Sequence, residues 1–322
     1  MENKGAFADL VCVDCRAKLD ETAEKLLSCA QCGSTYPMIN GVPRFSAEDD
    51  FYEGKVIHTN HWRDPRGGIS RLCASLDRAL NISKIRERFF FEAFKGPGDI
   101  LDVGCGGGTE LLTHFGVVTG VDLSGLSCEK AAEVYSRAVQ SDVVHMPFPE
   151  DRFDYVVGAD LFGHISVENK DVVISEFRRI LRPGGRLILV IECVGESPLW
   201  RFAKGRPDLW HTHFVLQDGH FGLETTQDAL SRFENAGFLR EVANRSHSDV
   251  WSVADYLARF KNDYRKGALP LRLWVHACKL IHKTRFTEHA ADLLLGITAR
   301  LTDSMRHINS TGALLVSFVN NK

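Results

Sequence analysis

The chain has 322 residues, of which 44% are hydrophobic and 25% are charged, a composition that excludes a disordered or fibrous protein. Its 39 Lys and Arg nearly balance 42 Asp and Glu, so overall charge gives no reason to expect a nucleic-acid binder. The longest apolar runs, such as residues 187–191 and 313–316, fall far short of the roughly 18 residues that cross a bilayer. The N-terminus lacks the pattern of a secretory signal, so we expect a cytoplasmic protein.

Four of the nine cysteines form two Cys-x-x-Cys pairs, Cys12 with Cys15 and Cys29 with Cys32. Each pair places two sulfurs on one tight turn, and two such turns supply the four thiolates of a tetrahedral zinc site. Four cysteines leave no open coordination position, which favours a structural over a catalytic zinc. Redox-active thiols are the alternative.

The sequence around these cysteines continues into a characteristic tail. The matching segments are Leu10-Val-Cys-Val-Asp-Cys15, Leu27-Ser-Cys-Ala-Gln-Cys-Gly33 and Tyr36-Pro-Met-Ile-Asn-Gly-Val-Pro43. Over about residues 8–46 the chain resembles the Trm112-like zinc-ribbon family, whose members occur alone as methyltransferase partners or fused ahead of methyltransferase domains. The resemblance implies a structural or docking role and a protein partner.

The central part of the chain has the alternation of an α/β fold. Short apolar runs at residues 100–103, 117–121, 155–158 and 186–191, with a weaker one near Val139, predict parallel strands. Helical periodicity predicts a helix over residues 167–181, stopped by Pro183-Gly-Gly185, and an amphipathic helix over residues 82–94. We therefore expect a Rossmann-like parallel sheet, preceded by a linker.

A glycine-rich turn and carboxylates follow the first strands. The turn has glycines at 104, 106 and 108, but a dinucleotide fingerprint would need one at position 109, which is Thr109. Asp102 ends the first strand and suits a cationic ligand, whereas Asp122 ends the second, where a carboxylate can accept from both ribose hydroxyls. The pattern favours adenosine carried by something other than a diphosphate. A turn-rich domain without a ligand is the alternative.

Five motifs in order extend this pattern over about residues 96–245. They are Ile100-Leu-Asp-Val-Gly-Cys-Gly-Gly-Gly108, Thr119-Gly-Val-Asp-Leu-Ser124, Ser141-Asp142 with Met146-Pro-Phe-Pro149, Phe153-Asp-Tyr-Val-Val157, and Ile180-Leu-Arg-Pro-Gly-Gly-Arg-Leu187. They resemble class I S-adenosylmethionine-dependent methyltransferases, especially small-molecule enzymes of the ubiquinone-biosynthesis type, which implies a seven-stranded sheet.

The same resemblance implies roles for individual residues. Asp102 lies near the methionine ammonium, Asp122 holds the ribose, and Asp142 accepts from the adenine amino group. The remaining residues that the resemblance assigns to the cofactor are Gly104, Cys105, Gly106, Gly108, Leu123, Val143 and Asp160. The segment Ser124-Gly-Leu-Ser-Cys128 departs from the commoner proline-containing pattern, which puts the adenine contacts there in doubt.

Methyl transfer is an in-line displacement, so a base is needed only if the nucleophile must lose a proton. His164 follows the fourth strand, and His220 lies in a loop that resembles the substrate-side loop of these enzymes. These two histidines are the candidate catalytic residues, and the alternative is that they only pack in the core. Glu192, at the end of the fifth strand, is a weaker candidate. No carboxylate or cysteine pattern lies near His211 and His213, so we expect them at the surface or lining the pocket rather than in a metal site.

The C-terminal part has an unusual layout. Strands are predicted over residues 238–243 and 313–319, as the antiparallel pair that the resembled fold places last, with an intervening helical segment that we expect to cover the pocket. Residues 259–285 hold eight Lys and Arg but one acid. A helix from Pro270 has a basic face with Arg272, His276, Lys279 and Lys283, and Leu273, Trp274, Ala277, Leu280 and Ile281 lie on the other face. This helix suits an anionic membrane, a phosphate-bearing substrate or a solvated lid.

The predicted domains are a zinc ribbon (1–46), a linker with N-terminal helices (47–95), a methyltransferase core (96–250 and 311–322) and a helical insertion (251–310). The leading hypothesis is an S-adenosylmethionine-dependent methyltransferase acting on a metabolite, glycan or lipid-linked intermediate. RNA methylation is disfavoured by the acidic pI of about 6.5. A non-catalytic partner that binds S-adenosylmethionine and docks through the ribbon is the third hypothesis. The acceptor atom and the oligomeric state are not encoded in any motif.

Overall fold

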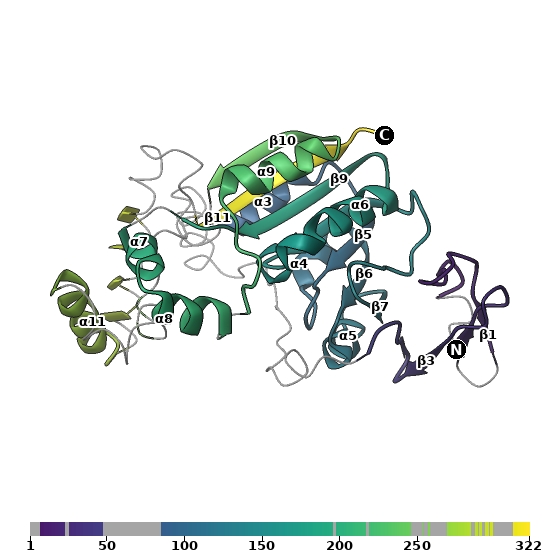
Figure 1. Cartoon of the computed structure of the whole chain (residues 1–322), viewed down its shortest axis with the longest axis horizontal. Coiled ribbons are helices and arrows are strands. Elements are labelled where there is room, and N and C mark those ends of the chain that lie inside the picture. Colours follow the sequence, from purple (N-terminus) through teal and green to yellow (C-terminus); the bar gives the residue numbers. More distant parts are fainter. Residues whose placement is uncertain are drawn as a thin grey trace, which may run out of the picture.

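The computed structural model describes residues 7–22, 26–47, 85–195, 198–216, 219–245, 253, 257, 269–284, 287–288, 290–291, 294–295, 297–298 and 312–322. Within them the chain forms a large seven-stranded sheet and a small four-stranded sheet. Figure 1 shows the small sheet at one end of the long axis and helices α7, α8 and α11 at the other, with the large sheet between them.

The large sheet has the strand order β10-β11-β9-β8-β5-β6-β7. Strands β5 to β9 run parallel, whereas β11 is antiparallel to both β9 and β10. The predicted Rossmann-like seven-stranded sheet and its final antiparallel pair are therefore confirmed. The strands are β5 (Gly98–Val103), β6 (Gly116–Asp122), β7 (Arg137–Gln140), β8 (Phe153–Ala159), β9 (Leu181–Glu192), β10 (Phe238–Arg245) and β11 (Ala313–Asn320).

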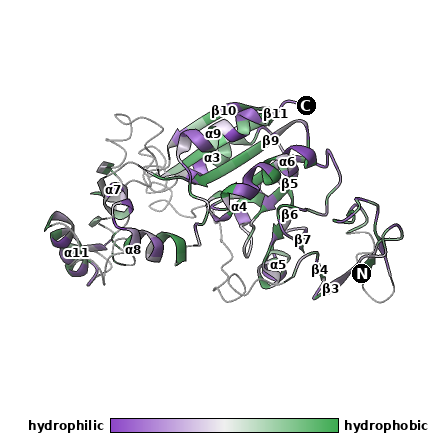
Figure 2. Cartoon of the chain, in the orientation of Figure 1, coloured by the Kyte–Doolittle hydropathy of each residue, from purple (hydrophilic) through white to green (hydrophobic). Residues whose placement is uncertain are grey.

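Helices cover both faces of this sheet because its strands are apolar on both sides, as the colouring of β9 and β11 shows (Figure 2). One core layer joins the strands to α3 (Ile85–Ala93), α4 (Glu110–Thr113) and α5 (Gly125–Ala131). The other joins them to α6 (Lys170–Ile180) and α9 (Thr226–Asn235). The helix predicted over residues 167–181 begins as a 3₁₀ turn, Val167–Asn169, and ends at Ile180, since Leu181 already pairs in β9.

The small sheet contains the two cysteine pairs and packs against one edge of the large sheet. Its strands are β1 (Asp20–Glu21), β2 (Leu26–Ser28), β3 (Thr35–Ile39) and β4 (Val42–Pro43), all antiparallel. Just after β4, the Phe45 N–H donates to the Gln140 carbonyl of β7 at 2.8 Å. Asp9 forms ion pairs with Arg137 and with Arg152, the latter at 2.7 Å. This module, residues 7–47 in the described structure, is called the ribbon below.

Between β9 and β10 the chain forms α7 (Pro198–Lys204), α8 (Pro207–Trp210) and a π-helical turn, His211–Leu216. Most of the helical insertion predicted over 251–310 lies outside the described residues. Its best-described element is α11 (Leu269–Ile281), on which Val275 and Cys278 are buried. Leu273 and Leu280, predicted on the apolar face beside Trp274, are more than half exposed. The domain limits drawn from the sequence stay predictions.

Among the described residues, no helix has the length and hydropathy required to span a membrane.

Candidate functional site

The turn after β5 forms the centre of the candidate site. Gly104, Gly106 and Gly108 have φ values of 68°, 50° and 82°, a region that side chains other than glycine rarely adopt. The N–H groups of Gly104 and Cys105 donate to the Val121 carbonyl at 2.8 and 3.1 Å. The turn is therefore tied to the carboxyl end of β6.

Asp122 at the end of β6 holds the turn with its carboxylate. One oxygen, Oδ2, accepts from the Gly106 N–H at 2.9 Å, and Oδ1 accepts from the Ser124 N–H at 2.9 Å. Each carboxylate oxygen has a further lone pair, so both can accept another hydrogen bond. The side chain is fixed in orientation and remains a double acceptor.

Asp102 is the buried acid of the site, with 6% of its surface exposed. The Tyr135 hydroxyl donates to Asp102 Oδ2 at 2.7 Å and in turn accepts from the Thr109 N–H at 2.7 Å. Burial raises the pKa of Asp102 to about 7, opposed by the Tyr135 hydrogen bond and reinforced by the charge of Asp122. This position therefore favours a cationic partner.

The end of β7 meets the ribbon at a cavity of about 490 Å³. Asp142 lies there, exposed, and its Oδ1 accepts from the Val144 N–H at 3.1 Å. Leu123 and Val143, predicted beside it, are half-buried. The residues lining the cavity are Val13, Asp14, Arg16 and Phe45 of the ribbon together with Ser141, Asp142 and His145. The ribbon thus borders the end of the site predicted for adenine.

Asp160 follows β8 and has a φ of 55°, an unusual backbone conformation for a residue other than glycine. Its carboxylate forms a two-pronged ion pair with Arg86 of α3, with Arg86 Nη2 lying 2.8 Å from Oδ1. Burial raises the pKa of Asp160, although the Arg86 charge acts in the opposite direction. Arg86 was not predicted as a site residue. The only sequence feature that could have indicated it is its position on the helix predicted to lead into the domain.

His164 and His220, the predicted catalytic histidines, lie together with Glu192. His220 Nε2 is 3.6 Å from Glu192 Oε1, and the centroids of the two imidazoles are 4.8 Å apart. The residues come from the 3₁₀ turn Phe162–His164, the end of β9 and the loop before α9. They form a compact polar cluster at the carboxyl end of the sheet.

Lys170 holds the loop that carries His220. This lysine side chain is 1% exposed, and its Nζ donates to the Gly222 carbonyl at 2.5 Å and to Glu224 at 2.9 Å. Arg232 of α9 pairs with the same Glu224 at 2.7 Å. No sequence pattern indicated this contact, since a lysine on a helix usually faces solvent.

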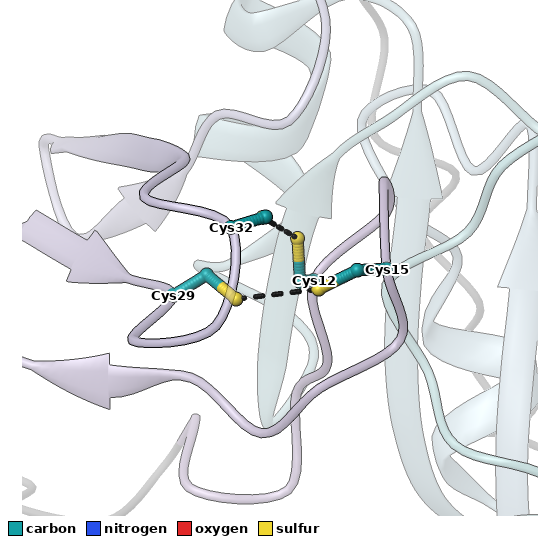
Figure 3. A group of neighbouring side chains, drawn as sticks. All are labelled: Cys12, Cys15, Cys29 and Cys32. Carbon is teal, nitrogen blue, oxygen red and sulfur yellow. Dashed lines mark hydrogen bonds between the residues drawn. The ribbon is translucent and has the colours of Figure 1, made fainter.

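The four ribbon cysteines converge at one point (Figure 3). Cys12 and Cys32 have their Sγ atoms 3.5 Å apart, Cys15 and Cys29 have theirs 3.4 Å apart, and all four lie within 4.8 Å of one another. A tetrahedral Zn–S₄ centre has sulfurs about 3.8 Å apart. Hydrogen bonds from Ser34 lower the pKa of Cys32 to about 6. Cys15 shifts the other way: against a lowering backbone hydrogen bond from Ala17, desolvation and the neighbouring thiols raise its pKa. This donor set fits a structural zinc.

Comparison with known proteins agrees with the fold. Residues 101–189 match the family described as "Methyltransferase domain". The 27-O-demethylrifamycin SV methyltransferase of Amycolatopsis mediterranei is 29% identical over 150 residues, which cover 42% of this chain and 51% of that protein. The demethylmenaquinone methyltransferase of Staphylococcus aureus is 27% identical over 196 residues, 52% of this chain and 78% of that protein.

A human protein, probable tRNA methyltransferase 9B, is 32% identical over 108 residues, which cover 33% of this chain and 24% of that protein. The chain thus spans about half the length of the rifamycin-type relative and a quarter of the human one. Residues 101–189 contain the glycine turn, Asp102, Asp122 and Asp142, and most of the parallel strands described above. The chain therefore contains a class I S-adenosylmethionine-dependent methyltransferase domain.

Proposed function

We propose that the protein transfers a methyl group from S-adenosylmethionine to a small-molecule acceptor. The observation that carries the proposal is the row of carboxylates beside the glycine turn. Asp102 and Asp122 end neighbouring parallel strands, Asp142 follows the next strand, and all three therefore lie at one edge of the sheet. The matched methyltransferase segment contains the same three residues.

The roles follow from the chemistry of each group. Asp122 accepts from the ribose hydroxyls, Asp102 faces the methionine ammonium, and Asp142 accepts from the adenine amino group. The turn of Gly104, Cys105, Gly106 and Gly108 lies against the methionine and ribose, Leu123 and Val143 lie against adenine, and Asp160 faces the methionine and the acceptor.

S-adenosylmethionine supplies an electrophilic methyl group on a sulfonium. The residues of this chain bind and orient the two reactants and exclude water, because an in-line displacement depends on the alignment of nucleophile, methyl carbon and sulfur. His220, paired with Glu192, and His164 are placed to accept the proton of an acceptor hydroxyl or amine.

A small-molecule acceptor is supported by the names of the rifamycin and menaquinone relatives, which denote low-molecular-weight acceptors. The tRNA-type relative supports an RNA acceptor over a shorter region, but the net charge of −3 does not favour a polyanion. We propose a structural zinc on Cys12, Cys15, Cys29 and Cys32, since four thiolates leave no position for chemistry. A protein partner at the ribbon remains a proposal from the Trm112-like resemblance.

Calorimetry with S-adenosylhomocysteine tests the cofactor site. Asp122→Ala should weaken binding by about 1–3 kcal/mol, because two charge-assisted hydrogen bonds are lost. Glu133→Ala, at an exposed carboxylate just after α5 that pairs with Lys130, is the matched control and should bind as the wild type does. Equal affinity of the two variants would refute the assignment of Asp122.

Turnover separates an enzyme from a binding partner. The wild type is incubated with S-adenosylmethionine carrying a labelled methyl group and with panels of phenols, quinols and unmodified transfer RNA. Label in a small product supports the proposal, and label only in RNA overturns its acceptor class. The non-catalytic partner would be favoured if the zinc-loaded protein binds S-adenosylmethionine but transfers the methyl group to none of these acceptors.

A further inference from the structure

The cluster of His164, Glu192 and His220 has the composition of a metal site distinct from the cysteines. Each residue offers one ligand atom, and the three ligand atoms lie within 4.8 Å of one another. The side chains of Glu192 and His220 are only 13% and 15% exposed. Two imidazoles and one carboxylate, held by three separate segments, are the ligands of many transition-metal sites that keep open positions.

Contacts with the backbone orient the side chains of His164 and Glu192. His164 Nδ1 lies 3.0 Å from the Gly219 carbonyl, to which it can donate, and in that tautomer Nε2 carries the lone pair. Glu192 Oε2 accepts from the Gly163 N–H at 3.2 Å, while Oε1 lies 3.6 Å from His220 Nε2. Two ligands about 2.1 Å from one tetrahedral ion are about 3.4 Å apart, close to this separation.

Because Gly163 has no side chain, the side chains of Glu192 and His220 can approach each other beside it. A Cβ at this position would lie 3.2 Å from Glu192 Oε2 and 3.3 Å from His220 Cδ2, closer than most contacts of a Cβ. A side chain there would therefore push the carboxylate and the imidazole out of place.

We propose that His164, Glu192 and His220 bind a divalent transition-metal ion of the Zn²⁺ class, and that the acceptor's hydroxyl oxygen occupies an open position on it. The ion would sit at the carboxyl ends of β8 and β9, the edge of the sheet that also carries Asp160. Imidazole nitrogens favour zinc, iron, cobalt or nickel over magnesium, which prefers oxygen ligands.

The acceptor part of this inference rests on the proposed methyltransferase function, whereas the metal part does not. Coordination lowers the pKa of a bound hydroxyl, so its proton passes to solvent water. With the ion bound, His164 and His220 act as ligands and no longer as acceptors of this proton. The oxygen then bonds to the methyl carbon while the carbon–sulfur bond breaks, and its electron pair stays on sulfur. The products are a methyl ether and S-adenosylhomocysteine.

Metal stoichiometry tests the site directly. Metal-free full-length chain is titrated with Zn²⁺ and, separately, with Co²⁺, whose absorption spectrum separates thiolate from nitrogen and oxygen ligands. We expect one equivalent on the cysteines and a second with the spectrum of nitrogen and oxygen ligands. Glu192→Gln, which keeps an oxygen for the Gly163 N–H, and His220→Ala should weaken only the second equivalent by about 10-fold or more.

His114→Ala is the matched control, since this exposed histidine lies in the turn between α4 and β6. The inference is overturned if the wild type takes up a single equivalent that disappears in Cys32→Ser, or if Glu192→Gln binds the second equivalent as tightly as the wild type. Circular dichroism of each variant excludes loss of fold. S-adenosylhomocysteine affinity, measured on the same samples, tests the proposed function separately, since it does not depend on this ion.

Discussion

The buried carboxyl of Asp102 should make cofactor binding depend on pH. The free protein holds this group at a pKa of about 7, chiefly because it is buried. If the ligand's ammonium binds beside it, the ionised form is stabilised and the pKa falls toward its ordinary value near 4. Binding below pH 7 must then release a proton, so affinity should fall as the pH falls through 7.

The size of the effect follows from the pKa of the free protein. At pH 6 only about one Asp102 in eleven is ionised, so S-adenosylhomocysteine should bind about 10-fold more weakly than at pH 8, with release of about 0.9 proton. Since the Tyr135 hydrogen bond lowers the pKa of Asp102, Tyr135→Phe should move the midpoint to higher pH.

Calorimetry in buffers of different ionisation enthalpy measures both the affinity and the number of protons released. Asp102→Asn keeps the shape of the side chain and removes its titration, so its affinity should vary little between pH 6 and 8. This variant also accounts for the pH dependence contributed by every other group of the protein. Equal pH dependence in the wild type and in Asp102→Asn would refute the reasoning.

Three further predictions concern the ribbon and the His220 loop. Cys32→Ser alters an exposed side chain, so it should remove bound zinc and lower the melting temperature of the chain without a packing cost; an unchanged melting temperature would exclude a structural metal. Lys170→Met should cost about 2–4 kcal/mol in urea unfolding because Glu224 loses a buried partner but keeps Arg232, and an unchanged midpoint would contradict this role. Gly125→Ala places a Cβ in a clash with Arg44 Nη1 and should cost about 1–3 kcal/mol, an effect that should largely disappear in an Arg44→Ala background if the clash is its cause.

Strands β5, β6, β8 and β9 could be predicted because each contains an apolar run that ends close to a glycine or an acid. The largest error concerns β9, which begins at Leu181 rather than Arg186. Pairing with β8 jumps from Phe153–Leu181 to Tyr155–Arg186, so the intervening Pro183 needs no ladder hydrogen bond. Pro183, Gly184 and Gly185 therefore follow the end of α6, as predicted, but they do not interrupt β9.

The helices α7 and α8 were missed although Pro198 and Pro207 stand at their starts, where proline is favoured. Arg86 and Lys170 were missed for another reason. Their partners, Asp160 and Glu224, lie 74 and 54 residues away along the chain. No local period or motif encodes a contact of that kind, so only the folded chain reveals it.

The two ends of the candidate site are built differently, and this difference explains which site residues could be predicted from the sequence. At the end proposed for the cofactor, Asp102 and Asp122 are placed by the ends of adjacent parallel strands, so the order of the strands brings them together. At the end proposed for the acceptor, His164, Glu192 and His220 meet through the loop before α9. Lys170 ties this loop to α6, and the Gly222 N–H donates to the Gly163 carbonyl at 3.0 Å. A change in that loop can therefore alter the acceptor without disturbing the cofactor, which is how one fold serves many substrates.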